Sequence, residues 1–208
     1  MNRKFIKNSN LVLRKVLNSN KGIDILKDFI ESFLKIQIRQ IKINNLPIIN
    51  GEISKKYGIV DARITTKDGE ELNVGIQIID GDYIQNKMFL YYAKIHSNQV
   101  FYKDKRKLAK TITINILDTA FFTSDKYHKV IKIKSNIIND NILETMELHV
   151  LQLPIFNKNP HYRVTNEELW MLYLKGCDDE ILNIVKEKNI YIKNLDSLID
   201  KYWEKEKI

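Results

Sequence analysis

Apolar and polar residues recur along this chain with two different periods, and the period changes several times. Over residues 23–34 the apolar side chains return every three or four positions, which is typical of an amphipathic helix with one buried face. Residues 11–17 show a similar pattern, and Asn20 and Gly22 interrupt the chain between the two segments. The pattern therefore predicts two consecutive helices at the start of the chain.

A strand pattern follows these helices. Over residues 36–43 isoleucines alternate with polar residues, with one slip near Gln40, so we expect a strand that carries a bulge. Two further strand-like runs cover residues 57–65 and 71–79, and Asp68-Gly69 lies between them. Because glycine supplies the positive φ that a tight turn needs, these two runs are predicted to form a β-hairpin.

The rest of the chain predicts one helix, three strands and a helical end. Apolar residues have helical spacing over 84–100, strand patterns cover 111–117, 128–133 and 148–153, and helical patterns return from Thr165 onward. A hairpin followed by a helix and more strands favours a mixed sheet with helices around it, which is an α+β fold.

The length of the hairpin loop decides which side chains share a face. With a three-residue loop, Asp61 lies directly opposite Gly75, and directly opposed residues point to the same side of the sheet. Gln77 shares that side because side chains alternate with period two. A loop of two residues would move Asp61 to the other face. A cluster of Asp61, Gly75 and Gln77 is therefore predicted, on the condition that the loop has three residues.

Composition and charge limit the classes of protein that are possible. The chain has 208 residues, a net charge of +8 and one cysteine, Cys177, which excludes an internal disulfide or a cysteine-based zinc site. Cys177 has no evident base beside it, so we interpret it as inert. We expect a cytoplasmic protein without a signal peptide or a membrane-spanning segment. The positive charge is compatible with binding to phosphate groups of DNA, and equally with a lysine-rich surface that binds nothing.

Several segments, taken in order, resemble a known family. They are residues 28–29, 58–64, 68–69, 73–78, 89–95, 111–118, 127–128 and 148–156, with Gln99 and Trp170. Their order and spacing over about residues 8–175 resemble the PD-(D/E)XK nuclease family transposases, which include the recombination-promoting nucleases. The resemblance implies a restriction-endonuclease-like mixed sheet flanked by helices. We expect that core over residues 1–160 and a helical carboxyl-terminal extension, packed on the same domain, over residues 161–208.

The resemblance also implies an activity and a set of site residues. Members cleave DNA with a divalent metal, which stabilises the developing charge and activates water. By this resemblance Asp61 would bind Mg²⁺, Gln77 would orient water or phosphate, and Lys87 would take the place of an arginine at the start of the following helix.

The match departs from the family pattern at the positions that carry the chemistry. Gly75 stands where the family has its metal-binding glutamate, and Asn10 stands where it has an aspartate. Gln152 and Ile155 replace a glutamate and a lysine in a later strand. Glu71 shares the face of Gly75 but lies roughly 13 Å along the strand. Asp82 lies past the end of that strand and would reach back only through a sharp turn.

Each candidate residue also has a structural interpretation. Asp61 can be a strand residue bonded to a nearby amide, and Gln77 can be a satisfied core amide. His128 and His149 lie on separate predicted strands without an acidic cluster of metal-ligand spacing, so we interpret them as packing or surface residues. The basic residues that could contact DNA phosphates, or simply form a solvated loop, are Lys103, Lys105, Arg106 and Lys107.

Three functions remain open from the sequence. The first is a nuclease-family protein with weak or no catalysis that retains DNA binding. The second is an active, metal-dependent endonuclease of recombination or transposition in which another carboxylate replaces the missing glutamate. The third is a protein-interaction module without nucleic acid. A homodimer is possible in each case.

Overall fold

The structure is a computed structural model that describes residues 12–44, 59–99, 108–123, 125–132, 146–158 and 163–206. Within it the chain forms two compact units, one made of residues 38–152 and the other of residues 1–37 with 153–208. The predicted domains, 1–160 and 161–208, remain a prediction. No helix in the described part of the chain combines the length and apolar character needed to cross a membrane.

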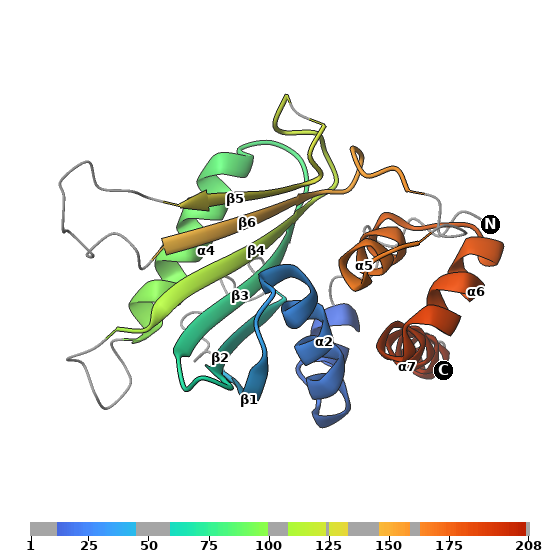
Figure 1. The fold of residues 1–208 in the computed structure, drawn as a ribbon, viewed down its shortest axis with the longest axis horizontal. Helices are drawn as coiled ribbons and strands as arrows, with labels where there is room; N and C mark the ends of the chain where they lie inside the picture. The colour runs from blue at the N-terminus through green and yellow to red at the C-terminus, as the bar shows by residue number, and fades with distance from the viewer. Residues whose placement is uncertain are drawn as a thin grey trace. The chain divides into compact units, whose positions relative to one another are not determined.

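In the residues that the structure describes, the unit of residues 38–152 is a six-stranded mixed sheet with one helix (Figure 1). Its elements are β1 (Ile38–Ile43), β2 (Val60–Thr66), β3 (Glu71–Ile79), α4 (Ile84–Asn98), β4 (Lys110–Leu117), β5 (His128–Lys132) and β6 (Met146–Gln152). The strand order is β1-β2-β3-β4-β6-β5. β3, β4 and β6 are parallel, whereas β1–β2, β2–β3 and β5–β6 pair antiparallel. The predicted α+β class with a mixed sheet is confirmed.

The bulge predicted in the first strand is present. The pairing of β1 with β2 shifts register between Ile38 and Gln40, where the alternation of apolar and polar residues slips in the sequence. An extra residue on one strand bends it locally and redirects the side chains that follow. The slip in the pattern therefore had a structural cause.

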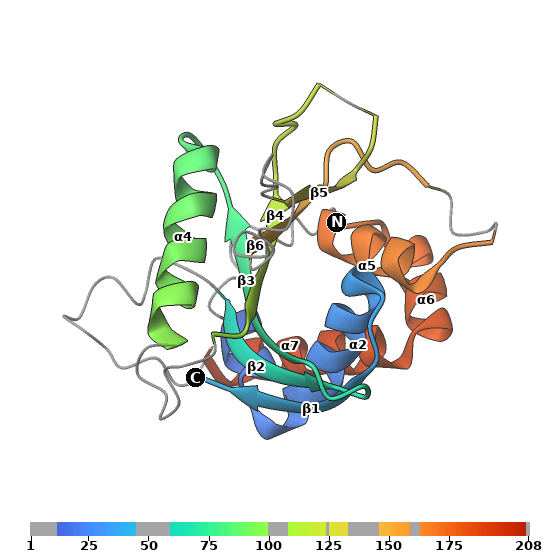
Figure 2. The same cartoon turned by 60° about the vertical axis from the view of Figure 1, so that its left-hand side comes forward.

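Helix α4 packs against β3 and β4 and covers one face of the sheet (Figure 2). At the amino-terminal end of the helix this face is apolar, where Ile84 and Met88 pack with Ile79, Leu117 and Val150. Toward the other end of the helix the same face of the sheet becomes polar. That change from apolar to polar packing places the predicted site beneath the second half of α4.

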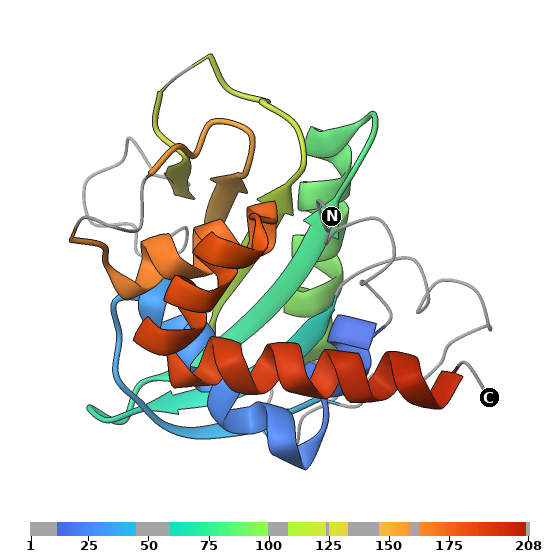
Figure 3. The same cartoon turned by 90° about the vertical axis from the view of Figure 1, so that its right-hand side faces the viewer.

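The second unit is helical. Residues 12–17 are helical. They are followed by the 3-10 turn η1 (Asn20–Gly22) and by α2 (Ile23–Leu34), α5 (Asn166–Lys175), α6 (Asp179–Lys188) and α7 (Ile190–Glu206). Figure 3 shows the length of α7, which contacts both α2 and α6. The helical carboxyl-terminal part predicted from the sequence is confirmed.

A partly buried acid, Asp28, joins these helices. The Asp28 carboxylate accepts hydrogen bonds from Trp170 Nε1 at 2.8 Å, Asn166 Nδ2 at 2.9 Å and Asn189 Nδ2 at 3.0 Å. Phe29 packs edge-on against Trp170, with ring centroids 5.2 Å apart. Since hydrogen bonds to a charged group are stronger than neutral ones, Asp28 fixes α2 against the carboxyl-terminal helices.

Candidate functional site

The hairpin has the register on which the predicted cluster depends. The Thr66 amide donates to the Glu70 carbonyl at 2.9 Å, and Gly69 has a φ of 87°, so the loop has three residues. Asp61 therefore pairs with Gly75 across the two strands. The prediction that Asp61, Gly75 and Gln77 share one face is confirmed, and this face is the one beneath α4.

Gly75 lies so close to α4 that a side chain here would overlap with side chains of the helix. A Cβ atom at this position would be 2.5 Å from Ile95 Cδ1 and 3.0 Å from both Cε1 and the hydroxyl oxygen of Tyr91. The tyrosine is fixed, because its hydroxyl lies 2.7 Å from the Val60 carbonyl oxygen and 3.0 Å from that of Ile76. The space of the family's glutamate is thus occupied by two buried side chains of the helix.

Asp61 is buried beside this contact. Its side chain is 5% exposed, its Oδ1 accepts a hydrogen bond from Asn44 Nδ2 at 3.0 Å, and its Oδ2 has no hydrogen-bond partner. Burial raises the pKa of Asp61 to about 6, although the amides of Asn44 and Asn98 and the charge of Lys94 act in the opposite direction. Asp61 is a carboxylate held in low dielectric with few groups that stabilise its charge.

Gln77 takes part in a polar network between the strands. Its Nε2 donates to Asn115 Oδ1 at 2.6 Å, and Asn115 Nδ2 donates to the His149 carbonyl at 3.0 Å. Both side chains are almost completely buried. Gln77 is therefore a satisfied core amide in geometry, and its proposed role toward water or phosphate stays a prediction.

The structure does not bring Lys87 to Asp61. Lys87 Nζ donates to the Asp80 carbonyl at 2.6 Å, just beyond the end of β3. Asp80 lies five residues past Gly75, which is roughly 17 Å at the rise of a strand. Lys87 therefore binds the backbone just beyond the end of β3, away from the predicted cluster.

Several predicted residues lie outside the described part of the chain. They are Asn10 and the four basic residues Lys103, Lys105, Arg106 and Lys107. Their predicted roles remain predictions.

Gln152, which replaces a family glutamate, anchors a loop. Its Oε1 accepts the backbone amides of Phe121 and Phe122, both at 2.8 Å, and its side chain is completely buried. Ile155, the replacement for the family lysine, is partly buried in the turn that follows β6. A neutral amide suits this position because one side chain can both accept and donate, and its Nε2 indeed donates to the Lys126 carbonyl.

The described residues around Asp61 do not fit a catalytic magnesium ion. Magnesium requires octahedral oxygen ligands and usually one or two carboxylates with several waters. Asp61 offers one unpartnered oxygen, but Gly75 offers none, and the space beside it is filled by Ile95 and Tyr91. Glu71 is paired with Arg63 instead. Within the described ranges, no three His, Cys, Asp or Glu side chains come together in a way that could hold a metal.

One cluster was missed by the sequence reasoning. His149 Nε2 lies 2.7 Å from Glu147 Oε1, and His149 Nδ1 lies 2.9 Å from His128 Nε2. Lys110 and Lys132 contact the other oxygen of Glu147 at 2.8 and 3.0 Å. The histidines adjoin a single acid and not an acidic cluster of metal-ligand spacing, and the spacing Glu147-x-His149 on one strand face was the signal that could have revealed this contact.

This cluster is a chain of hydrogen bonds between β5 and β6. Bonding to His149 is the largest of the effects that hold the pKa of Glu147 well below its usual range. Burial lowers the pKa of His149, so this ring is neutral and donates Nε2–H to the carboxylate. With two ammonium groups on one carboxylate, the surroundings disfavour a bound cation.

Cys177 has the environment expected of an unreactive thiol. It is partly buried, and burial together with the carboxylates of Asp178, Asp196 and Asp179 raises its pKa to about 11. Since the thiolate is the reactive form, very little of it exists near neutral pH.

Comparison with known proteins gives one match. The sequence model of the PD-(D/E)XK nuclease family transposases matches residues 8–208, nearly the whole chain. No curated protein and no solved structure shows significant similarity to this chain. The resemblance implied a hairpin followed by a helix, and the structure has both, in β2–β3 and α4. The chain therefore belongs to the PD-(D/E)XK nuclease family transposases.

Proposed function

We propose that this chain is a DNA-binding member of the family that has lost metal-dependent phosphodiester hydrolysis. The observation that carries the proposal is the contact at Gly75, where even a Cβ atom would lie 2.5 Å from Ile95 Cδ1. A second metal-binding carboxylate can be placed there only if the buried side chains of Ile95 and Tyr91 move aside. Asp61 is buried under α4, and one buried carboxylate is a weak ligand set for a metal that must also contact a phosphate.

DNA binding is the part of the family's function that does not need this site. The net charge of +8 favours association with a phosphate backbone, because each neutralised phosphate releases counterions. The predicted basic residues Lys103, Lys105, Arg106 and Lys107 would contribute phosphate contacts. We also retain as proposals a cytoplasmic location and a possible homodimer.

Duplex binding and its salt dependence test this function. We expect a labelled duplex to bind with an affinity that falls steeply as salt rises, with a slope that reports the number of phosphates contacted. A variant with Lys103, Lys105, Arg106 and Lys107 changed to glutamine should bind more weakly and with a shallower slope. Adding Mg²⁺ in place of a chelator should leave the DNA intact.

The two alternatives give different results in the same assays. An active nuclease with a relocated carboxylate would cut the duplex when Mg²⁺ or Mn²⁺ is present. A protein-interaction module would show no measurable affinity for the duplex at low salt, and that result would contradict the proposed function.

A further inference from the structure

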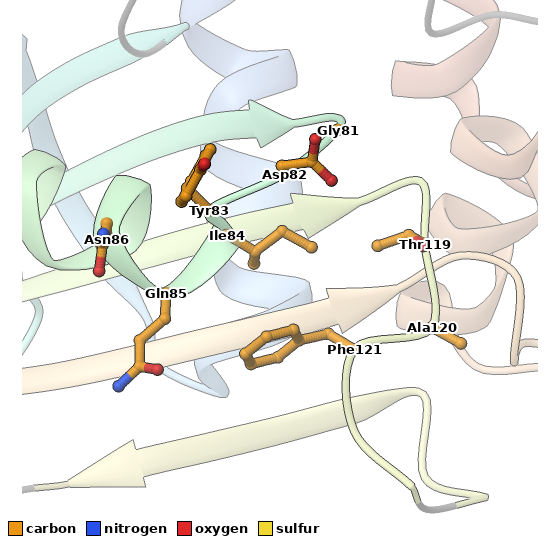
Figure 4. Close-up of a pocket in the computed structure, with 9 residues that line it drawn as sticks. All are labelled: Gly81, Asp82, Tyr83, Ile84, Gln85, Asn86, Thr119, Ala120 and Phe121. Carbon is orange, nitrogen blue, oxygen red and sulfur yellow. The ribbon is translucent and has the colours of Figure 1, made fainter.

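A pocket lies at the carboxyl-terminal ends of β3 and β4, against the first turn of α4 (Figure 4). It has a volume of about 500 Å³ and is lined by residues 81–86 and 119–121. The pocket lies at the far end of α4 from Asp61 and shares no residue with the predicted catalytic cluster. Clefts at the carboxyl ends of neighbouring parallel strands are common ligand sites in open sheets.

Two aromatic rings line this pocket and are exposed. Tyr83 is 77% exposed and Phe121 is 37% exposed, although rings of this size are usually buried. Tyr83 also has a φ of 60°. This value lies in the left-handed region, which residues other than glycine and asparagine rarely adopt. Packing within the fold does not account for an exposed ring on a strained backbone, so a role toward a ligand is indicated.

Phe121 is held in position from beneath. The completely buried Gln152 accepts the backbone amides of Phe121 and Phe122, and the two rings pack edge to face with centroids 4.8 Å apart. Lys129 Nζ lies 4.5 Å above the centroid of Phe122, which adds a positive charge next to the aromatic pair. Phe121, the ring on this side of the pocket, is therefore held in place by Gln152 and by Phe122, which does not itself line the pocket.

The polar side chains of the lining are two neutral amides, one carboxylate and the hydroxyl groups of Thr119 and Tyr83. The first turn of α4 contributes Gln85 and Asn86, both exposed, and the preceding loop contributes Asp82. These groups both donate and accept, as the edges of nucleobases do. None of the residues lining the pocket is cationic and Asp82 is acidic, so the side chains of the lining do not favour a phosphate.

We propose that this pocket binds an unpaired nucleobase of single-stranded DNA, stacked on Tyr83 and Phe121 with its edge toward Gln85 and Asn86. Aromatic platforms beside basic residues are the usual means of binding single strands, because every base has a face that stacks. The inference rests on the proposed DNA-binding function and deepens it by naming the form of DNA that is preferred.

Overhangs with and without bases test the inference directly. The affinities of three DNAs are compared at fixed salt by fluorescence anisotropy. They are a blunt duplex, the same duplex with a single-stranded overhang, and the same overhang built from abasic nucleotides. The wild type is expected to bind the overhang with bases roughly tenfold more tightly than the abasic one, the size of one stacked base.

Two variants and a control assign this preference to the pocket. Tyr83→Gly removes the ring at a position where glycine is favoured by the backbone, so it should fold normally and lose the preference for bases. Phe121→Ala should do the same. Phe89→Ala removes another exposed ring of α4, outside the pocket, and should keep the preference.

The outcomes separate this inference from the proposed function. Equal affinity of the wild type for the base-containing and the abasic overhang, with duplex binding intact, overturns the inference alone. A preference for bases that survives both Tyr83→Gly and Phe121→Ala also overturns it. Absence of binding to every DNA, the blunt duplex included, contradicts the inference and the proposed function together.

Discussion

Replacing Gly75 with glutamate is expected to destabilise the protein by at least about 3 kcal/mol, without restoring a metal site. The new Cβ would lie 2.5 Å from Ile95 Cδ1 and 3.0 Å from the Tyr91 ring. Ile95 and Tyr91 are both buried, so their side chains must be displaced within the core to admit the new one. The carboxylate would also lie next to Asp61 without a cation. Equilibrium unfolding in denaturant measures the loss of stability.

Two further variants separate the steric cost from the charge. Gly75→Ala adds only the Cβ atom and is expected to cost about 1–3 kcal/mol. Combined with Ile95→Ala, which removes the atom in closest contact, the double variant should lose less stability than the sum of the two single changes. Strict additivity, or a Gly75→Glu protein as stable as the wild type, would show that the space beneath α4 is open.

Asp61→Asn is expected to stabilise the protein by about 2–3 kcal/mol at about pH 8. Burial raises the pKa of Asp61 from 3.8 to about 6, so the folded state disfavours the charged carboxylate that the unfolded state accepts. The wild type therefore loses stability as pH rises from about 4 through about 6, and asparagine does not. The amide keeps an oxygen to accept the bond from Asn44.

The pH dependence of this gain is its control. Denaturant unfolding at about pH 4 should show a gain below about 1 kcal/mol, because Asp61 is then protonated in the folded wild type. Asp82→Asn, the same change at an exposed site, should alter stability by less than about 0.5 kcal/mol at either pH. A loss of stability in Asp61→Asn at about pH 8 would mean that the charge is compensated.

Much of the fold could be predicted because local chemistry decides it. Asp68-Gly69 specified the turn, and Gly69 does adopt the positive φ that a three-residue loop requires. The register of the hairpin then followed by counting, and with it the shared face of Asp61 and Gly75. The bulge near Gln40 could be predicted because, without an extra residue, a slip in a period of two would turn the apolar side chains to the other face of the sheet.

The environment of the candidate site could not be predicted in the same way. That Ile95 and Tyr91 fill the space above Gly75 depends on how α4 crosses the sheet, which no local pattern encodes. The contact between His128 and His149 depends on β5 pairing antiparallel with β6, although 21 positions separate the two residues. The loop anchored by Gln152 was hidden for the same reason, since its partners lie about 30 positions earlier.

Cleavage of supercoiled plasmid tests the central claim, that hydrolysis has been lost at this site, most directly. Wild type and Asp61→Asn are incubated with Mg²⁺, with Mn²⁺ and with a chelator, at a salt concentration where DNA is bound. We predict that neither protein converts supercoiled plasmid to the nicked form above the background without protein. Metal-dependent nicking by the wild type that is absent from Asp61→Asn would contradict the account, because Asp61 would then serve a working metal site.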